Sequence, residues 1–335
     1  MPGATPTDSL PRSVAQSAWA RLVARAPLAR AIDAFLRGVS QVVFQDHLPC
    51  ALLILLAVAW AAYDGRHPAL LGGAVLATVI ATLTARLLGA NAALLRRGLF
   101  GYNGMLVGIA LPTFLSSSPA LWACIVLGAL LSTVAMLAFI TLLRPWRLQV
   151  LTAPFVLITW CLLLAAYPFA RLPGAGLPAP VLAHAASIDP SLPFTVQDTL
   201  LAALRGVAQV FFLPDAASGA LILAGIAVAS RRAALAAAAG SLLSLAVAWL
   251  LGADRAATLA GLYSFSAVLT AVALGDALGG PGPRAATYAA FGVIATVIVQ
   301  AALNTLLAPL GIPALTMPFV LTTWLFLLAR RLARD

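Results

Sequence analysis

The sequence predicts an all-α, polytopic membrane protein built from two inverted homologous halves, each with five transmembrane helices and one re-entrant half-helix. Three observations predict this fold class: the composition, the length of the charge-free segments and an internal repeat. The 335 residues are 62% hydrophobic and only 9% charged, whereas a soluble globular domain carries about a quarter charged residues. The composition therefore excludes a soluble core with a polar shell.

Several long segments carry no charged side chain, and a helix crosses the bilayer core with about 17 to 25 apolar residues. These segments are Leu48–Tyr63, Pro68–Ala85, Gly98–Leu143, Gln149–Ala170, Ala216–Ser230, Ala233–Ala253, Ala285–Leu310 and Gly311–Ala329. They are long enough, or nearly so, to span a membrane as helices.

The elements follow in order along the chain. Residues 1–30 start polar and then contain several arginines, which predicts a cytoplasmic N-terminal arm with a short amphipathic helix. Residues 31–170 form the first transmembrane repeat. Its expected spans are Ala31–His47, Leu48–Asp64, Ala69–Gly89, Leu121–Leu143 and Leu151–Pro168.

The segment Ala90–Pro112 is left over within this first repeat. It carries Arg96 and Arg97 and then a glycine-rich apolar run interrupted by Pro112. A full span would place the two arginines badly, and irregular backbone at membrane depth is tolerated only inside protein or beside a cavity. We therefore predict a re-entrant half-helix here.

The second half begins after a linker. Residues 171–197 are rich in proline and glycine, as extramembrane connections are. Residues 198–335 then form the second transmembrane repeat.

Three motif pairs recur in the same order, which establishes an internal duplication. LRGVSQVVF (36–44) matches LRGVAQVFF (204–212) at seven of nine positions, and LTAPFVLITW (151–160) matches LTMPFVLTTW (315–324) at eight of ten. GLFGYNGMLVGIAL (98–111) matches GLYSFSAVLTAVAL (261–274) more loosely.

An odd number of spans per half inverts the second half relative to the first, and ten spans place both termini on one side. Every basic residue is arginine, and arginines cluster at both termini, so the positive-inside bias predicts that this side is the cytoplasm. Arg231 and Arg232 fall on the opposite side and run against the bias. The net charge of +10 lacks the interleaved aromatics of a nucleic-acid groove, so no nucleic-acid partner is expected.

The repeated polar and aromatic residues are the candidate site. They are Gln41, Phe44, Tyr102, Thr152 and Phe155 in the first half, and Gln209, Phe212, Phe265, Thr316 and Phe319 in the second. A glutamine in an apolar span needs hydrogen-bond partners, and a proline frees a carbonyl one helical turn earlier. For one copy, ordinary helix packing explains such residues; duplication in both halves favours a permeation pathway between inverted repeats.

The acidic residues are all aspartates at predicted span ends or in loops. Ion-coupled transport needs ionisable groups at depth, so a neutral solute moving downhill is the natural inference. Cys50, Cys124 and Cys161 have no metal-ligand spacing, and no catalytic cluster is visible, so we expect no metal, no cofactor and no enzyme.

The LRGxxQVxF, GLFGYNG and LTxPF elements, with their counterparts, resemble the urea transporter family over about Ala31 to Ala329. The resemblance implies a homotrimer in the bilayer of a bacterial inner (plasma) membrane. By this resemblance, each protomer would have its own urea pore, with aromatic slots, a ladder of oxygen atoms along one wall and a pair of threonines in the middle.

Carried onto this chain, the resemblance implies that Gln41 and Phe44 lie at one mouth and Gln209 and Phe212 at the other. Thr152 and Thr316 would mark the constriction, and Leu106 and Leu269 would be apolar walls. Tyr102 stands where the family has phenylalanine, whereas Phe265 keeps it.

Other functions remain open at this point. The pore could serve another small neutral solute such as ammonia, water or a short amide. An ion-coupled transporter and an intramembrane enzyme rank lower, because the sequence offers neither a relay of ionisable groups nor a catalytic cluster.

Overall fold

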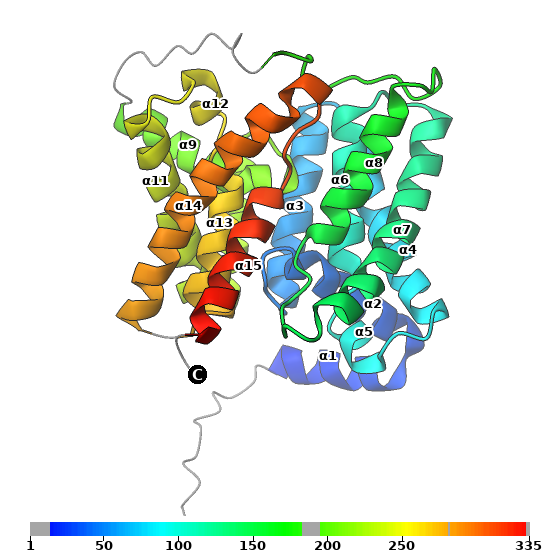
Figure 1. Cartoon of the computed structure of the whole chain (residues 1–335). Helices are drawn as coiled ribbons and strands as arrows, with labels where there is room; N and C mark the ends of the chain where they lie inside the picture. Colours follow the sequence, from blue (N-terminus) through cyan, green and yellow to red (C-terminus); the bar gives the residue numbers. More distant parts are fainter. Residues whose placement is uncertain (1–13, 183–194, 281, 333–335) are drawn as a thin grey trace, which may run out of the picture.

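The computed structural model describes residues 14–182, 195–280 and 282–332. The start of the expected arm, residues 1–13, and part of the expected linker, residues 183–194, lie outside the described residues. The regular secondary structure of the described residues is helical, apart from an isolated bridge between Leu115 and Gly174, and Figure 1 shows the arrangement of the helices. The all-α prediction is confirmed.

The helices of the two halves follow one another in the same order. After α1 (Val14–Arg25), the first half comprises α2 (Pro27–Gln41), α3 (Leu48–Asp64), α4 (Ala69–Leu87), α5 (Ala92–Arg96), α6 (Gly101–Phe114), α7 (Pro119–Leu143) and α8 (Ala153–Ala166). The second half comprises α9 (Val196–Ala208) with η1 (Gln209–Phe211), α10 (Ala216–Ala229), α11 (Arg231–Leu250), α12 (Arg255–Leu259), α13 (Phe265–Val272) with the π-helical η2 (Ala273–Ala277), α14 (Pro283–Leu307) with η3 (Ala308–Leu310), and α15 (Met317–Leu332).

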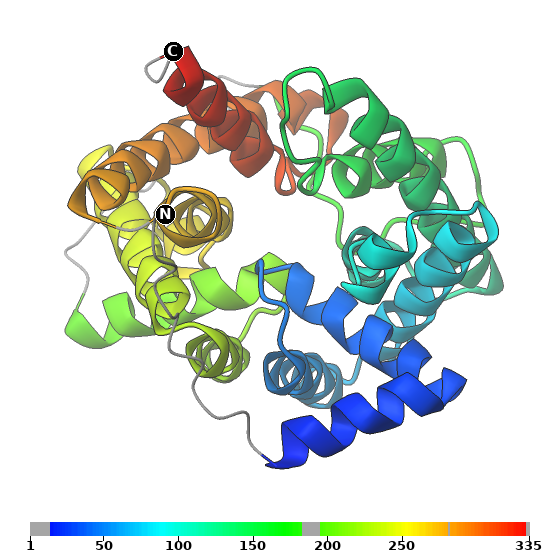
Figure 2. The same cartoon turned by 90° about the horizontal axis from the view of Figure 1, so that it is seen from below.

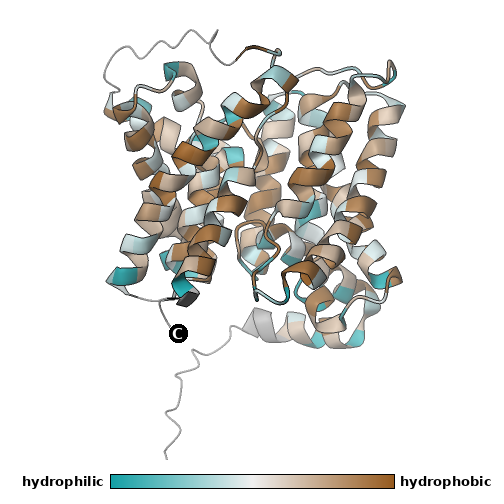
Figure 3. Ribbon diagram, in the orientation of Figure 1, coloured by the Kyte–Doolittle hydropathy of each residue, from teal (hydrophilic) through white to brown (hydrophobic). Residues whose placement is uncertain are grey.

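Several helices are long and apolar enough to cross a membrane, so the chain is an integral membrane protein. Among the described helices, α4, α7, α11 and α14 with η3 qualify on their own, and α9 with α10 qualifies as one pair bent by 75°. The helices α3, α8, α13 with η2, and α15 are apolar but shorter. Hydrophilic residues are concentrated toward the two ends of the helices in Figure 3, as expected for a bilayer-spanning body.

Two segments of the first half differ from the prediction by more than two residues. The helix expected over Ala31–His47 ends at Gln41, because Phe44 takes up a left-handed backbone conformation (φ 62°) before α3 starts. The segment Ala90–Pro112 is not one half-helix: Asn91 caps the short α5, and α6 then continues through Pro112 to Phe114.

The halves lie side by side around a common centre. In Figure 2 the helices of the first half (blue to green) and of the second half (lime to red) together form a ring. In Figure 1 α5 lies at the bottom and its counterpart α12 at the top.

The repeated glycines bring two motifs of each half into backbone contact. An ideal Cβ on Gly98 (φ +70°) would lie 2.2 Å from the Gly38 backbone nitrogen, and one on Gly261 (φ +80°) would lie 2.5 Å from the Gly206 nitrogen. Only glycine permits both this left-handed conformation and this close approach. The LRG and GL elements of the repeat therefore pack against each other in the same way in both halves.

Candidate functional site

Two cavities contain most of the repeated residues. Cavity 1, of about 350 Å³, is lined among others by Gln41, Phe44, Tyr102, Thr152 and Phe319. Cavity 2, of about 690 Å³, is lined among others by Gln209, Phe212 and Phe265. Cavity 1 borders Leu94 of α5 and cavity 2 borders Leu262, just after α12. Because α5 and α12 lie at opposite ends of the molecule (Figure 1), the two cavities lie toward opposite ends as well.

Each cavity has an aromatic pair with one ring from each half. Phe44 of the first half meets Phe319 of the second, with ring centroids 6.0 Å apart and planes at 78°. At cavity 2, Phe212 of the second half meets Phe114 of the first at 5.8 Å and 84°. Phe212 also meets Phe155, which is fully buried and lines neither cavity, at 6.0 Å and 64°. These edge-to-face contacts are favourable for aromatic rings and join the halves at both cavities.

Two buried threonines meet between the halves. The Thr152 and Thr316 hydroxyl oxygens lie 2.6 Å apart and share a hydrogen bond. Thr152 is the N-cap of α8, yet its side chain caps no backbone N–H. The hydroxyl that would ordinarily cap the helix is used across the centre instead.

The prolines of this motif have a different role from the predicted one. Pro154 stands in the first turn of α8, which begins at Ala153, and Pro318 follows Met317, the first residue of α15. Proline is favoured at helix starts because no N–H is needed there. These prolines therefore start helices and free no carbonyl within one.

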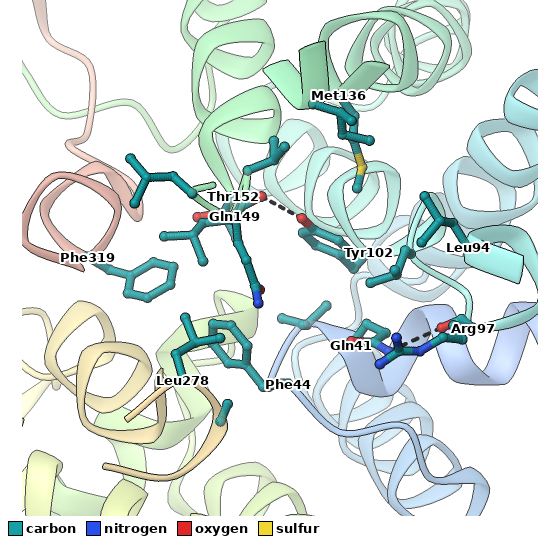
Figure 4. A pocket seen from close by; sticks show the side chains of 17 residues that line it. Gln41, Phe44, Leu94, Arg97, Tyr102, Met136, Gln149, Thr152, Leu278 and Phe319 are labelled. Atoms are coloured by element: carbon teal, nitrogen blue, oxygen red, sulfur yellow. Dashed lines mark hydrogen bonds between the residues drawn. The ribbon is translucent and has the colours of Figure 1, made fainter. Parts of the chain in front are cut away.

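The leucines that precede the threonines present carbonyl oxygens to polar side chains. The Tyr102 hydroxyl donates to the Leu151 carbonyl at 2.6 Å, and the Asn103 amide donates to it at 3.4 Å. In the second half the Ser266 hydroxyl donates to the Leu315 carbonyl at 3.4 Å. Figure 4 shows Tyr102 and Thr152 together in cavity 1.

Backbone strain recurs at equivalent positions. Phe44 and Phe212 have φ of 62° and 59°, and Leu151 and Leu315 have φ of 55° and 52°. Such a conformation costs a non-glycine residue on the order of 1–3 kcal/mol and is often found at functional sites. The four strained residues all lie in the motifs that line the cavities.

The tryptophan that ends each LTxPF motif bonds to the other half. The Trp160 indole donates to the Pro313 carbonyl, and the Trp324 indole donates to the Gln149 carbonyl, each at 2.8 Å. Both carbonyl residues line a cavity. These reciprocal bonds hold the segment before each threonine in place.

Sequence reasoning missed Gln149, which points toward Phe44 and Phe319 in cavity 1 (Figure 4). Its counterpart is Pro313, so a search restricted to repeated residues passes over it. The sequence feature that could have identified Gln149 is that it is a further glutamine in an apolar segment. Leu106 and Leu269, the expected apolar walls, are fully buried and line neither cavity.

The arginines of the two LRG motifs, Arg37 and Arg205, have partners. Arg37 bonds to Asp33 and Asp46, and Arg205 donates to the Leu259 carbonyl at 3.2 Å. Arg97, which lines cavity 1, lies 3.7 Å from Asp46, and its carbonyl accepts from the Gln41 amide at 3.2 Å. This charged group stands beside cavity 1, whereas His67 is the one ionisable side chain among the described residues that line cavity 2.

Comparison with known proteins identifies the family. The family model described as urea transporter matches residues 32–331. Urea transporter 1 of Ovis aries is 29% identical over 304 residues, which is 89% of this chain and 76% of that protein. Urea transporter 1 of Rattus norvegicus is 30% identical over 307 residues, again 89% of this chain and 76% of that protein. The chain therefore belongs to the urea transporter family.

Proposed function

We propose that the protein conducts urea passively across the membrane, along a path from cavity 1 to cavity 2 past Thr152 and Thr316. Family membership supports transport of urea, and the relatives named above are described as transporters, not enzymes. The observation that carries the proposed path is the hydroxyl pair at 2.6 Å. Thr152 lines cavity 1, and Leu315, the neighbour of Thr316, lines cavity 2.

The chemistry of the path suits urea. Urea is planar and uncharged, with amide N–H donors and a carbonyl acceptor, and burying such groups without partners costs several kcal/mol. The glutamines, the threonine hydroxyls and the Leu151 and Leu315 carbonyls replace the bonds to water. The rings of Phe44 and Phe212 offer flat faces and weak N–H···π contacts.

The threonine pair also bears on the free-energy cost of urea crossing the centre of the path. Because the two hydroxyls touch, urea passes only when they separate. The hydroxyl–hydroxyl bond is then replaced by bonds to urea, so the number of hydrogen bonds is kept. An ion finds no fixed charge there to compensate its lost hydration.

Flux through reconstituted vesicles tests the proposal. We expect stopped-flow urea permeability well above that of empty vesicles, independent of sodium and proton gradients. Thr152→Val removes one hydroxyl, worth on the order of 1–1.5 kcal/mol, and should lower the permeability about tenfold; Gln41→Ala should lower it as well. Thr305→Val, an exposed change on α14, is the matched control.

Unchanged permeability in Thr152→Val would remove the threonine pair from the path, and dependence on an ion gradient would replace the channel by a coupled transporter. Ammonia, formamide and thiourea, tested in the same vesicles, separate a urea channel from a path for other neutral solutes.

The proposed architecture completes this function. We infer two inverted halves, each with five spans and a re-entrant segment, assembled as a homotrimer in the inner (plasma) membrane with both termini cytoplasmic. The opposite placement of α5 and α12 supports the inversion (Figure 1). The arginines near both termini support the orientation, and the trimer rests on the family resemblance.

A further inference from the structure

Equivalent positions of α7 and α14 line the two cavities with different chemistry. Met136 and Ile140 of α7 line cavity 1, and Gln300 and Asn304 of α14 line cavity 2. Each residue precedes the threonine of its own half by the same number of residues as its counterpart. The duplication thus placed an apolar pair beside one cavity and an amide pair beside the other.

The Gln300 amide is buried and incompletely bonded. Gln300 is 2% exposed, its Nε2 donates to Asn304 Oδ1 at 2.9 Å, and its Oε1 has no partner. Exchanging oxygen and nitrogen in both amides keeps this bond and leaves an N–H donor at the same place. In either orientation a buried polar atom lacks its hydrogen bond, which is unfavourable in the absence of a partner.

A second polar atom beside the same cavity is in the same situation. The Nδ1 atom of His67, from the turn between α3 and α4, is buried without a partner, and His67 lines cavity 2. Among the described residues that line cavity 1, by contrast, none has a buried side-chain N or O atom without a partner.

We propose that Gln300 and Asn304 form a binding subsite for a small neutral amide in cavity 2, outside the threonine pair. The ligand class follows from the site: an amide supplies both a donor and an acceptor, which matches the Gln300–Asn304 pair in either orientation. A charged ligand would find only His67 as an ionisable group among the described lining residues. This subsite rests on the proposed function, and urea is its natural ligand. Cavity 1 has Met136 and Ile140 at the equivalent positions, so the subsite is present in cavity 2 and not in cavity 1.

Binding and flux are measured separately. The binding probe is methylurea, detected through its methyl protons by saturation-transfer difference NMR on the full-length protein in detergent. Gln300→Met and Asn304→Ile each install the residue of the other half, and Thr305→Val on the same helix, outside both cavity linings, is the control. Asn304 is exposed in the single chain, so Asn304→Ile tests the site even where Gln300→Met fails to fold.

We expect Gln300→Met to raise the apparent Kd of methylurea about tenfold, the value of one lost hydrogen bond. Asn304→Ile should raise it severalfold, and Thr305→Val should leave it unchanged. An unchanged Kd in Asn304→Ile and in every folded Gln300 variant overturns the subsite and leaves ordered water as the partner of Gln300.

Urea flux in vesicles keeps the two proposals apart. If wild-type vesicles conduct urea but methylurea binding is unaffected by these variants, the subsite fails and the channel stands. If no urea flux is found while binding still weakens in the variants, the channel fails and the subsite stands.

Discussion

Tyr102 and Phe265 occupy equivalent positions, but only Tyr102 carries a hydroxyl. This hydroxyl makes the hydrogen bonding of the Leu151 carbonyl different from that of the Leu315 carbonyl. The Tyr102 hydroxyl takes up the Leu151 carbonyl at 2.6 Å, whereas the Leu315 carbonyl receives only a long bond of 3.4 Å from Ser266. The Leu315 carbonyl is therefore the better acceptor for a passing N–H group. Tyr102 therefore makes the Leu151 carbonyl a weaker acceptor than its counterpart in the second half.

Removal of this hydroxyl should raise urea flux. Tyr102→Phe removes the short bond to the Leu151 carbonyl and leaves only the 3.4 Å bond from Asn103, so we expect higher urea permeability by stopped-flow light scattering. The free energy of unfolding should fall by about 1 kcal/mol, because one internal hydrogen bond is lost.

The reciprocal change is the control. Phe265→Tyr adds a hydroxyl beside the Leu315 carbonyl and should lower urea permeability. A lower permeability in Tyr102→Phe would show instead that the phenol assists passage.

At the scale of elements, contacts between glycines fix the packing of one helix in each half. In the first half α2 packs against the segment between α5 and α6, and in the second half α9 packs against the segment between α12 and α13. Gly98 meets Gly38 and Gly261 meets Gly206, backbone against backbone. This contact positions the end of α2 and of α9, where Gln41 and Gln209 stand. The distance between those glutamines and the threonine motifs thus depends on glycine residues that take no part in the chemistry.

Alanine substitutions of Gly89 and Gly98 distinguish the cost of backbone strain from the cost of lost backbone packing. Gly89 has a similar φ of +71° but nothing within 4 Å of an added Cβ, whereas a Cβ on Gly98 would lie 2.2 Å from the Gly38 nitrogen. Gly89→Ala should cost about 1–2 kcal/mol from backbone strain alone, and Gly98→Ala should cost more or prevent folding. Thermal unfolding in detergent measures both, and equal losses of stability would argue against the packing role.

At the scale of the whole molecule, contacts between the halves occur in reciprocal pairs. The Phe44–Phe319 and Phe212–Phe155 rings and the two tryptophan bonds each join one half to the other. Each half therefore completes the cavity of its partner. The inverted arrangement that we propose would give the two cavities access to opposite sides of the membrane.

Accessibility to a membrane-impermeant maleimide tests this inversion. In a background with Cys50, Cys124 and Cys161 replaced by alanine, Arg96→Cys on α5 and Ala256→Cys on α12 introduce single exposed thiols. We expect labelling of the two from opposite sides of oriented vesicles. Labelling of both from the same side would contradict two inverted halves.

The helical membrane class, the duplication and most helix positions can be read from the sequence alone. The expected span Leu48–Asp64 matches α3 at both ends, and the expected Leu121–Leu143 differs from α7 only at its start. Apolar runs bounded by proline, glycine and arginine carry this information locally, because a helix in a bilayer must satisfy its own backbone. The repeat also predicts Thr152 and Thr316 as site residues, and the structure brings their hydroxyls into contact.

Which residues face one another depends on contacts between distant segments, and no local sequence pattern encodes these contacts. The Phe44–Phe319 ring pair and the bond from Trp324 to the Gln149 carbonyl join distant parts of the chain, and spacing within one half says nothing about a partner in the other. The end of α2 at Gln41 follows from a left-handed turn that packing stabilises. Gln149 and Gln300 have counterparts of a different type, Pro313 and Met136, so their roles emerge only where the folded halves enclose the cavities.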